Sequence, residues 1–330
     1  MPDFATEGES LVEFPDDLTP SPAAPVAAVG DLSATGKQAD AMKIIAVTNI
    51  KGGVGKTTTA VNLSYLCAAS SGPTLLWDLD PQGAATYTLQ GDPLERATPK
   101  KLLSGKRHLP ELILSTGYSN LDLLPADFSY RNFDVHLAER KRPAERLLKM
   151  SRSLREVYSV LFLDCAPGIS LLSENVLHAA DAIIVPLLPT PLSVRMLVQL
   201  QDFIASKGWT DLMLLPFFSM VDRRKSLHHE IIAKTREQFP TLLATEVPYS
   251  SEIERMSARR APIPAFAPRS AAAQIYSALW AELMLSVWPG RSGFPCPRPA
   301  PVSQARGPDS TSGRPWQAVP SQQGRVPTQS

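Results

Sequence analysis

Residues 43–60, "KIIAVTNIKGGVGKTTTA", decide the fold, because a short apolar run leads into a glycine-rich loop and then into a helix-compatible stretch. The window that ends at Thr57 fits the phosphate-loop pattern G-x-x-x-x-G-K-[ST], except that Ile50 stands where the pattern has glycine. Two lysines, Lys51 and Lys56, flank the glycines. One lysine is enough to hold a phosphate, so the role of the second needs an explanation.

Charge and cysteine content narrow the class of protein. The 330 residues suffice for one large α/β domain or two small ones, and the net charge is only +1. Residues 1–40 nevertheless hold eight acids and one base, whereas residues 289–330 hold five arginines and one acid. Cys67, Cys165 and Cys296 have neither paired nor metal-ligand spacing, which indicates a reducing cytosol. We expect no signal peptide and no membrane-spanning helix.

The pattern along the chain predicts one α/β domain over residues 42–288, between a disordered acidic Pro/Ala-rich tail (1–41) and a disordered Pro/Arg-rich tail (289–330). Apolar runs alternate with helical patterns inside it, which predicts a mostly parallel twisted sheet with helices on both faces. Ligands then bind at the edge where the strands end. Strands are predicted at 43–49, 73–80, 121–125, 159–165, 182–188, 212–221 and 244–248. Helices are predicted at 56–70, 132–150, 170–178, 192–206, 226–238, 251–260 and 269–287.

The loop has the chemistry of a phosphate site. Gly52, Gly53 and Gly55 let backbone N–H groups turn toward phosphate oxygens, and the following helix adds its positive end. Lys56 then reaches the β and γ phosphates, and the Thr57 hydroxyl binds Mg²⁺. The alternative interpretation is a glycine-rich surface turn.

The chain resembles the ParA/MinD branch of P-loop ATPases, because "KGGVGKTT" is similar to the deviant Walker A motif of that family. Further resemblances to the family follow in order over residues 42–285, and the last two are to the C-terminal third of the ParA/Soj partition ATPases. They comprise "WDLDPQGAAT" (77–86), "LFLDCAPGISLLSENVLHAAD" (161–181), "VPLLPTPLSVRML" (185–197), "MVDRRKSLHHEI" (220–231) and "TEVPYSSEIERMSARRAPIPAFAPRSAAAQIYSALWAEL" (245–283). Two positions depart from the family pattern, Ala84 and Ala166, which replace an asparagine and a proline.

The resemblance implies an ATP hydrolase that uses Mg²⁺, acts slowly until a partner stimulates it, and forms a homodimer when ATP is bound. It assigns nucleotide binding to Lys51, Gly52, Gly53, Val54, Gly55, Lys56, Thr57 and Thr58. Lys51 would contact the phosphates of the other subunit, where its charge offsets that of the transferring phosphoryl group. The alternative is a solvated lysine at the end of a strand.

Three aspartates end apolar strands at the same expected edge. By resemblance, Asp164 holds Mg²⁺ as a Walker B acid and Asp80 positions the attacking water. Asp78 lies on the same strand face as Asp80, so we expect it to support the metal. For each of them, a helix cap or a turn acid is the alternative. Cys165 is expected in the core.

Basic residues late in the domain suggest a surface for DNA. The resemblance to partition ATPases implies nonspecific DNA binding through phosphate neutralisation, a nucleoid-associated cytoplasmic location and a ParB-like or cargo adaptor partner. The candidate residues are Arg223, Arg224, Arg255, Arg259, Arg260 and Arg269. The alternative is that these arginines only form a solvated basic surface. We expect His228 and His229 on a solvated helix face.

The competing function is that of a MinD-like ATPase that cycles on the membrane for spatial regulation of division. The last predicted helix carries large apolar residues, but it has no Lys or Arg between Arg269 and Arg291. Packing against the sheet explains its apolar face more simply, so we expect no membrane binding. An iron–sulfur enzyme is excluded by the cysteine positions.

Overall fold

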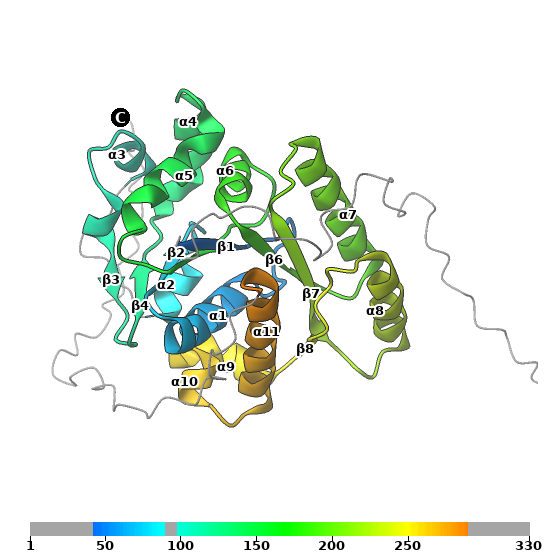
Figure 1. Cartoon of the computed structure of the whole chain (residues 1–330). Helices are drawn as coiled ribbons and strands as arrows, with labels where there is room; N and C mark the ends of the chain where they lie inside the picture. Colours follow the sequence, from blue (N-terminus) through cyan, green and yellow to red (C-terminus); the bar gives the residue numbers. More distant parts are fainter. Residues whose placement is uncertain (1–41, 90–97, 290–330) are drawn as a thin grey trace, which may run out of the picture. The chain divides into compact units, whose positions relative to one another are not determined.

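The computed structural model describes residues 42–89 and 98–289 (Figure 1). The disorder predicted for residues 1–41 and 289–330 lies outside these ranges, except at Pro289. In the described part, eight strands form one sheet in the order β3-β4-β2-β5-β1-β6-β7-β8, parallel except for β3 at one edge. The strands are β1 Lys43–Val47, β2 Thr74–Asp78, β3 Leu114–Ser115, β4 Leu121–Leu124, β5 Val160–Asp164, β6 Ala182–Leu187, β7 Met213–Val221 and β8 Val247–Pro248.

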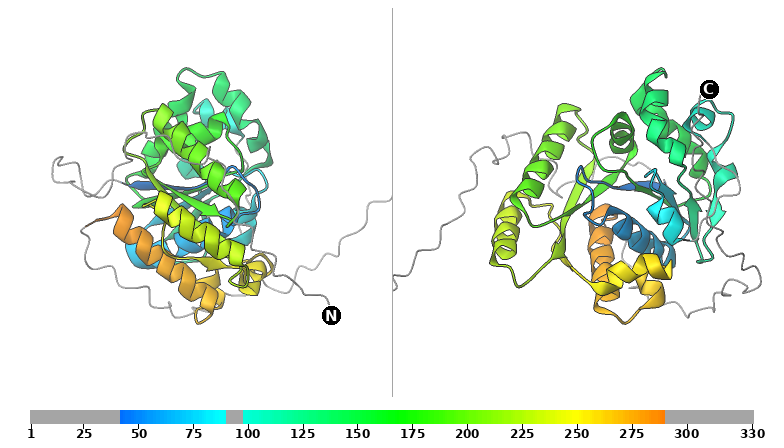
Figure 2. Two further views of the ribbon diagram at one scale, coloured as in Figure 1. Left: turned by 90° about the vertical axis from the view of Figure 1, so that its right-hand side faces the viewer. Right: turned by 180° about the vertical axis from the view of Figure 1, so that it is seen from behind.

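Helices cover both faces of the sheet, as the views of Figures 1 and 2 agree. One face carries α1 Lys56–Ser71, α2 Ala84–Thr88, α9 Ser251–Arg259, α10 Ile263–Phe266 and α11 Ala271–Val287. The other carries α3 Pro99–Leu103, α4 Phe133–Ala138, α5 Arg146–Ser151, α6 Leu171–Ala179, α7 Pro191–Ser206 and α8 Ser226–Gln238. Short 3₁₀ turns lie at η2 Leu109–Leu112, η3 Phe128–Asn132, η4 Pro143–Glu145 and η5 Arg152–Leu154.

Strand β5 shows why the apolar runs are continuous. Val160 and Phe162 point into the core beneath α1 and α11, whereas Leu161 and Leu163 point into the core on the opposite face. A strand that is buried on both faces has no solvated side, so the alternation of polar and apolar residues disappears. The predicted fold class is therefore confirmed.

The predicted helix over 132–150 is wrong as a single element. Pro143 disfavours the helical conformation for the residue before it, and Arg142 has a positive φ of 52°. The chain therefore breaks between α4 and α5, with Pro143 opening the turn η4. The sequence also gave no signal for the short elements β3, α2 and α3.

Four helices of the described ranges begin where a serine or threonine caps them, among them α9, whose cap Ser250 accepts the N–H of Glu252. The side chains of Ser170, Thr190 and Ser270 accept hydrogen bonds from backbone N–H groups in the first turns of α6, α7 and α11. The last helix, α11, buries Tyr276, Leu279 and other apolar residues against α1 and the sheet, as predicted. No helix of the described ranges is long and apolar enough to cross a membrane.

Candidate nucleotide and metal site

The loop between β1 and α1 lies at the carboxyl edge of the sheet, because it follows the last residue of β1, which runs parallel to its neighbours β5 and β6. Gly53 and Gly55 have φ values of 70° and 91°, which residues with a Cβ rarely adopt. A Cβ at either position would meet no atom within 4 Å, so backbone conformation rather than space requires glycine. Helix α1 begins after Gly55 without a side-chain cap, which leaves its first N–H groups for an anion.

The two lysines of the loop differ in burial and in the partners of their side chains. Lys56 is buried, and its Nζ donates a hydrogen bond to the carbonyl oxygen of Lys51 at 3.1 Å. Burial lowers the pKa of Lys56, while the charges of Asp164 and Asp80 act against this shift. The side chain of Lys51 is partly exposed and forms no ion pair with any residue in the described part of the chain. Lys51 is therefore the loop cation that remains open to a ligand from outside.

Two side chains fix the loop against neighbouring strands. Buried Asn49 accepts a hydrogen bond from the N–H of Lys51 (2.9 Å) and donates one to the carbonyl of Pro186 in β6 (2.7 Å). The hydroxyl of Ser219 in β7 donates to the carbonyl of Val54 (2.7 Å). These bonds preorganise the loop without any ligand. Neither Asn49 nor Ser219 belongs to a recognisable functional motif, so neither role could be predicted from the sequence.

Asp164 ends β5 with an unusual carboxylate. It is fully buried, and neither of its oxygens has a hydrogen-bond partner among the described residues. Burial and the charge of Asp78 raise its pKa well above the usual range, and the nearby Thr57 hydroxyl and Lys56 partly oppose this. An orphaned carboxylate beside a hydroxyl and a phosphate loop fits a Mg²⁺ ion.

The donor set also fits the way Mg²⁺ is held at nucleotides. Within the described ranges, no group of three or more His, Cys, Asp or Glu side chains is arranged to hold a metal by itself. Mg²⁺ at such sites takes one or two protein ligands and completes its shell with phosphate oxygens and water. Asp164 and Thr57 would thus hold the ion only together with a nucleotide.

Asp78 is the register partner of Asp164 across β2 and β5, but its surroundings differ. Its Oδ2 accepts hydrogen bonds from the N–H (2.8 Å) and hydroxyl (2.7 Å) of Thr86, and its Oδ1 accepts one from the N–H of Asp80 (3.2 Å). Burial raises the pKa of Asp78, and these donors act against the shift. Both oxygens are thus engaged in holding the segment that carries Asp80.

Asp80 follows the strand and is half-buried. Its carboxylate accepts the N–H of Gln82 (2.9 Å), and its carbonyl accepts the N–H of Gly83 (2.9 Å), so the residue sits in a tight turn. Thr86 ties this turn to the next segment, because its hydroxyl also accepts the N–H of Ala126 (2.9 Å). Thr86 ends the "GAAT" motif at residues 83–86, where no role was predicted for it.

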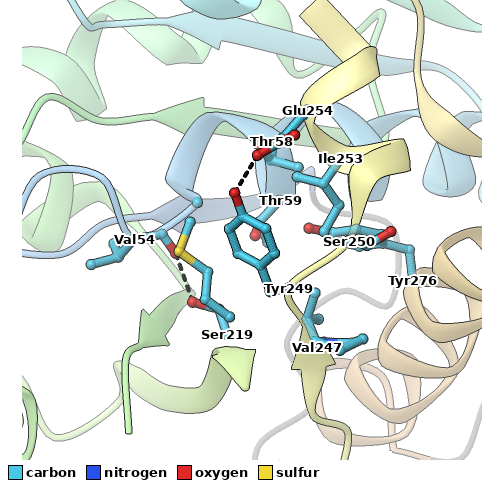
Figure 3. Close-up of a pocket in the computed structure, with 13 residues that line it drawn as sticks. Val54, Thr58, Thr59, Ser219, Val247, Tyr249, Ser250, Ile253, Glu254 and Tyr276 are labelled. Atoms are coloured by element: carbon cyan, nitrogen blue, oxygen red, sulfur yellow. Dashed lines mark hydrogen bonds between the residues drawn. The ribbon is translucent and has the colours of Figure 1, made fainter. Parts of the chain in front are cut away.

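A hollow of about 220 Å³ opens beside the loop (Figure 3). It runs from Val54 and Thr58 to the turn after β8, where Tyr249 is 66% exposed and its hydroxyl donates to Glu254. Strand β7 has an irregular register at Met220 (φ 54°), which also lines the hollow. The hollow is smaller than a typical drug-sized pocket, but it adjoins the phosphate loop. Val54 and Thr58 belong to the predicted nucleotide-binding residues, whereas no role was predicted for Met220 or Tyr249.

The six arginines proposed for DNA differ in their surroundings. Arg224 makes two hydrogen bonds to the Asp222 carboxylate (2.9 and 3.0 Å). Arg260 packs over the ring of Tyr87 at 4.7 Å and donates to its carbonyl (3.0 Å). The remaining four are exposed without a carboxylate partner in the described ranges: Arg223, Arg255, Arg259 and Arg269.

Two expectations about single residues have different outcomes. Cys165 is buried, as predicted. The prediction that His228 lies on a solvated face is wrong, because it is buried and its Nδ1 accepts the N–H of Asp222 (3.1 Å). The tight turn before α8 draws the ring inward, and helical periodicity cannot reveal such a contact. His229 is exposed, and its Nε2 hydrogen-bonds to the carbonyl of Arg223 (2.8 Å).

Comparison with known proteins places the same residues in a family context. A family model described as an AAA domain matches residues 42–207. The sporulation initiation inhibitor protein Soj of Bacillus subtilis is 31% identical over 250 residues, which cover 73% of this chain and 98% of Soj. The chromosome partitioning protein ParA of Caulobacter vibrioides is 32% identical over 220 residues, covering 61% of this chain and 78% of that protein.

A solved structure shares the fold and was determined with ligands. It is the cobyrinic acid a,c-diamide synthase of Mycobacterium smegmatis with a bound ATP analogue and magnesium. It superposes with a TM-score of 0.66 and 26% identity, over 76% of this chain and 97% of that one.

Proposed function

Because the chain belongs to the ParA/Soj-type partition ATPases of the deviant Walker A P-loop family, we propose that it is an ATP-driven dimerising switch. The ATP-bound dimer binds DNA without sequence preference and positions or segregates a plasmid, a chromosome or a protein cargo. Hydrolysis is slow until a ParB-like or cargo adaptor partner stimulates it. The protein acts in the cytoplasm, on the nucleoid.

The loop binds the phosphates of the nucleotide, and the adjoining hollow binds its base. The open N–H groups at the start of α1, together with Lys56, bind the phosphates. Thr57 and Asp164 hold Mg²⁺, which supplies charge neutralisation for the transferring phosphoryl group. The hollow between Val54 and Tyr249 receives the adenine, since it is the mostly apolar space next to the loop.

Asp80 orients the attacking water, and two neighbours keep it in place. The Asp78 carboxylate accepts the Asp80 N–H and both donors of Thr86, so the turn after β2 has a fixed position relative to β5. Asp78 is therefore a positioning residue in this proposal rather than a metal ligand. Catalysis consists of positioning and electrostatics, without a covalent intermediate.

The main observation that supports dimerisation is that Lys51 lies at the mouth of the loop with no anionic partner in the described part of its own chain. A second copy would bring phosphates to it. Two exposed apolar side chains follow the neighbouring strands β5 and β6, namely Ile169 (53% exposed) in the loop before α6 and Leu192 (52%) in the first turn of α7. Exposed apolar groups around a site are typical of a surface that is covered by a partner.

The four unpaired arginines supply the proposed DNA contact. Arg255 and Arg259 lie on the exposed side of α9, and Arg223 follows β7 at the same edge as the nucleotide loop. Dimerisation would double the number of cations facing one duplex, which couples ATP binding to DNA affinity. Binding should weaken steeply with salt, because it depends on counterion release.

The MinD-like alternative has less support. Tyr276, Trp280 and Leu283 of α11 are buried in the core, so this helix has no free apolar face for a membrane. Leu285 is exposed, but a single exposed leucine is ordinary.

Variant Asp80→Ala with bound ATP tests the proposal in three arms. Light scattering should show a dimer with ATP and a monomer with ADP. Co-sedimentation should show retention on plain DNA that fades as salt rises, and no retention on anionic liposomes. Monomers in every nucleotide state would refute the switch, and retention on liposomes alone would favour the MinD-like function.

A further inference from the structure

A basic groove lies on the sheet face opposite α1, away from the nucleotide loop, where α3, α5 and α6 come together (Figure 1). It consists of two adjoining hollows of about 450 and 360 Å³, which share Arg146 and Lys149 of α5. The first also includes Arg142, Arg152 and His178 at the end of α6, and the second includes Arg107 after α3. Segments far apart in the sequence thus form one surface.

The charge of the groove is strongly unbalanced. Residues 98–112 and 138–156 together contain eleven Lys and Arg but only four Asp and Glu. Two arginines have carboxylate partners, in the ion pairs Arg142–Glu145 (3.6 Å) and Arg107–Glu111 (3.4 Å). Lys141, Lys149 and Arg152 have none within the described ranges. The groove therefore attracts an anionic ligand.

The groove is held in shape by buried hydrogen bonds. Asn175 of α6 is fully buried, and its side-chain oxygen accepts the N–H groups of Arg146 (3.1 Å) and Leu147 (3.2 Å) at the start of α5. Asp134 of α4 accepts the N–H of Leu172 in α6 (2.7 Å). A side chain of α6 thus caps the start of α5, and a side chain of α4 caps the start of α6. A ligand would therefore meet a preformed surface.

The lining also contains apolar side chains. Met150 lines the second hollow and Leu148 the first, and both side chains are half-buried, whereas Leu102, Leu103 and Leu109 behind the second hollow are buried in the core. A nucleic-acid backbone offers phosphates but no aliphatic groups to bury there. An acidic peptide with interleaved apolar residues offers both.

The same chain contains such a segment. Residues 7–17, "EGESLVEFPDD", hold five acids and no base, together with Leu11, Val12 and Phe14. The chain enters the sheet next to the groove, because Asp181 accepts the N–H of Ile44 (2.8 Å) and lies three residues after His178. The intervening residues 18–41 span about 27 Å as a flexible chain and up to about 80 Å when extended, which is enough to reach it.

We propose that residues 7–17 dock in the basic groove of their own chain. Their carboxylates pair with Arg142, Lys149 and Arg152, and their apolar side chains cover the half-buried Leu148 and Met150. The segment thereby excludes other polyanions from this surface. The inference does not rest on the proposed nucleotide switch, since no residue of the phosphate loop lines the groove.

Carbodiimide cross-linking of the full chain tests the contact. A carboxylate of residues 7–17 and the Nζ of a groove lysine form an amide, and the carbodiimide takes up the lost water as its urea. Mass spectrometry should join the segment to Lys141 or Lys149 and not to Lys225, an exposed lysine before α8. The yield should fall several-fold in high salt.

Two charge variants make the result specific. Glu9→Gln/Glu13→Gln leaves the folded domain untouched, and Arg142→Glu/Arg152→Glu changes only exposed groove residues. Each double variant should lower the yield of the cross-link to Lys141 and Lys149 several-fold, while the circular dichroism spectrum stays unchanged. Cross-links that persist in both variants, or that occur equally at Lys225, would overturn the proposal.

Two further outcomes assign the groove to another occupant. Mixing ¹⁴N- and ¹⁵N-labelled protein reveals cross-links between copies, which would replace docking in the same chain by docking in a second chain. If Arg142→Glu/Arg152→Glu instead weakens binding of a labelled DNA duplex and no cross-link to the segment forms, the groove is a nucleic-acid surface and the proposal is wrong.

Discussion

The Nζ of Lys56 donates a hydrogen bond to the backbone carbonyl of Lys51 at 3.1 Å, so one lysine of the loop braces the backbone of the other. Lys56 is buried inside the loop, whereas the Lys51 side chain projects partly into solvent. The two cations therefore have separable roles. One shapes and fills the phosphate site of its own chain, and the other is placed for a ligand that arrives from outside.

Substitution of the two lysines should separate nucleotide binding from hydrolysis. Lys56→Ala should abolish binding of an ATP analogue, because the buried cation of the loop is lost. Lys51→Ala should keep that binding and slow hydrolysis by about 10²–10³-fold, since it removes charge stabilisation in the transition state. Calorimetry and phosphate release measure the two effects, with Lys101→Ala, an exposed lysine of α3, as control. Equal loss of binding in both variants would contradict this division.

Asn49 should contribute to stability through the two hydrogen bonds that join the loop to β6. Asn49→Ala leaves the Lys51 N–H and the Pro186 carbonyl without these partners, so the free energy of unfolding should fall by about 1–3 kcal/mol. Urea unfolding measures it. Asn132→Ala, at an exposed position without a side-chain cap, should change little. A similar loss of unfolding free energy in both variants would show that the two Asn49 hydrogen bonds have no special role.

Alanine substitution should change the stability of the ligand-free protein in opposite directions at Asp78 and Asp164. Asp164→Ala removes a buried carboxylate without donors, so the ligand-free protein should gain about 1 kcal/mol, or roughly 2–4 °C in Tm. Asp78→Ala leaves Thr86 and the Asp80 N–H unpaired and should cost about 1–3 kcal/mol.

Calorimetry of the ligand-free variants checks this pair. Both should lose Mg²⁺-dependent ATP hydrolysis, so stability rather than activity separates them. If Asp164→Ala lowers the Tm, the carboxylate has a structural partner and the metal assignment loses its main support.

Cys67 should make stability depend on alkaline pH. Burial raises the pKa of this thiol to about 12 from an ordinary value of 9.0. The unfolded chain therefore ionises first as pH rises above about 9, and the contribution of the thiol to stability is lost between about pH 9 and 12. At pH 10 the loss is about 1.4 kcal/mol.

Denaturant unfolding of the wild type and Cys67→Ala at pH 8 and pH 10 measures the difference. The variant should lose less stability between the two values, because other groups that titrate in this range are common to both proteins. Parallel pH profiles would show that Cys67 is accessible to ionisation in the folded state.

Much of the site could be predicted from sequence, because its chemistry lies in contiguous motifs. Gly53 and Gly55 have the positive φ that a phosphate loop requires, and Asp164 ends a buried strand, as its apolar run indicated. The partners of these residues could not be predicted. Asn49 meets Pro186, and Asp78 meets Thr86, through contacts that depend on strand order and on a turn without a periodic pattern.

The sequence by itself determined the parallel sheet and the position of the phosphate loop, since continuous apolar strands and left-handed glycines are local properties of the chain. Only the tertiary structure decided that Asp78 is saturated with donors while its neighbour Asp164 has none. Likewise, only packing brought Arg107 and Lys149 to one groove. Burial and hydrogen-bond partners are set by segments distant in sequence, so no local pattern encodes them.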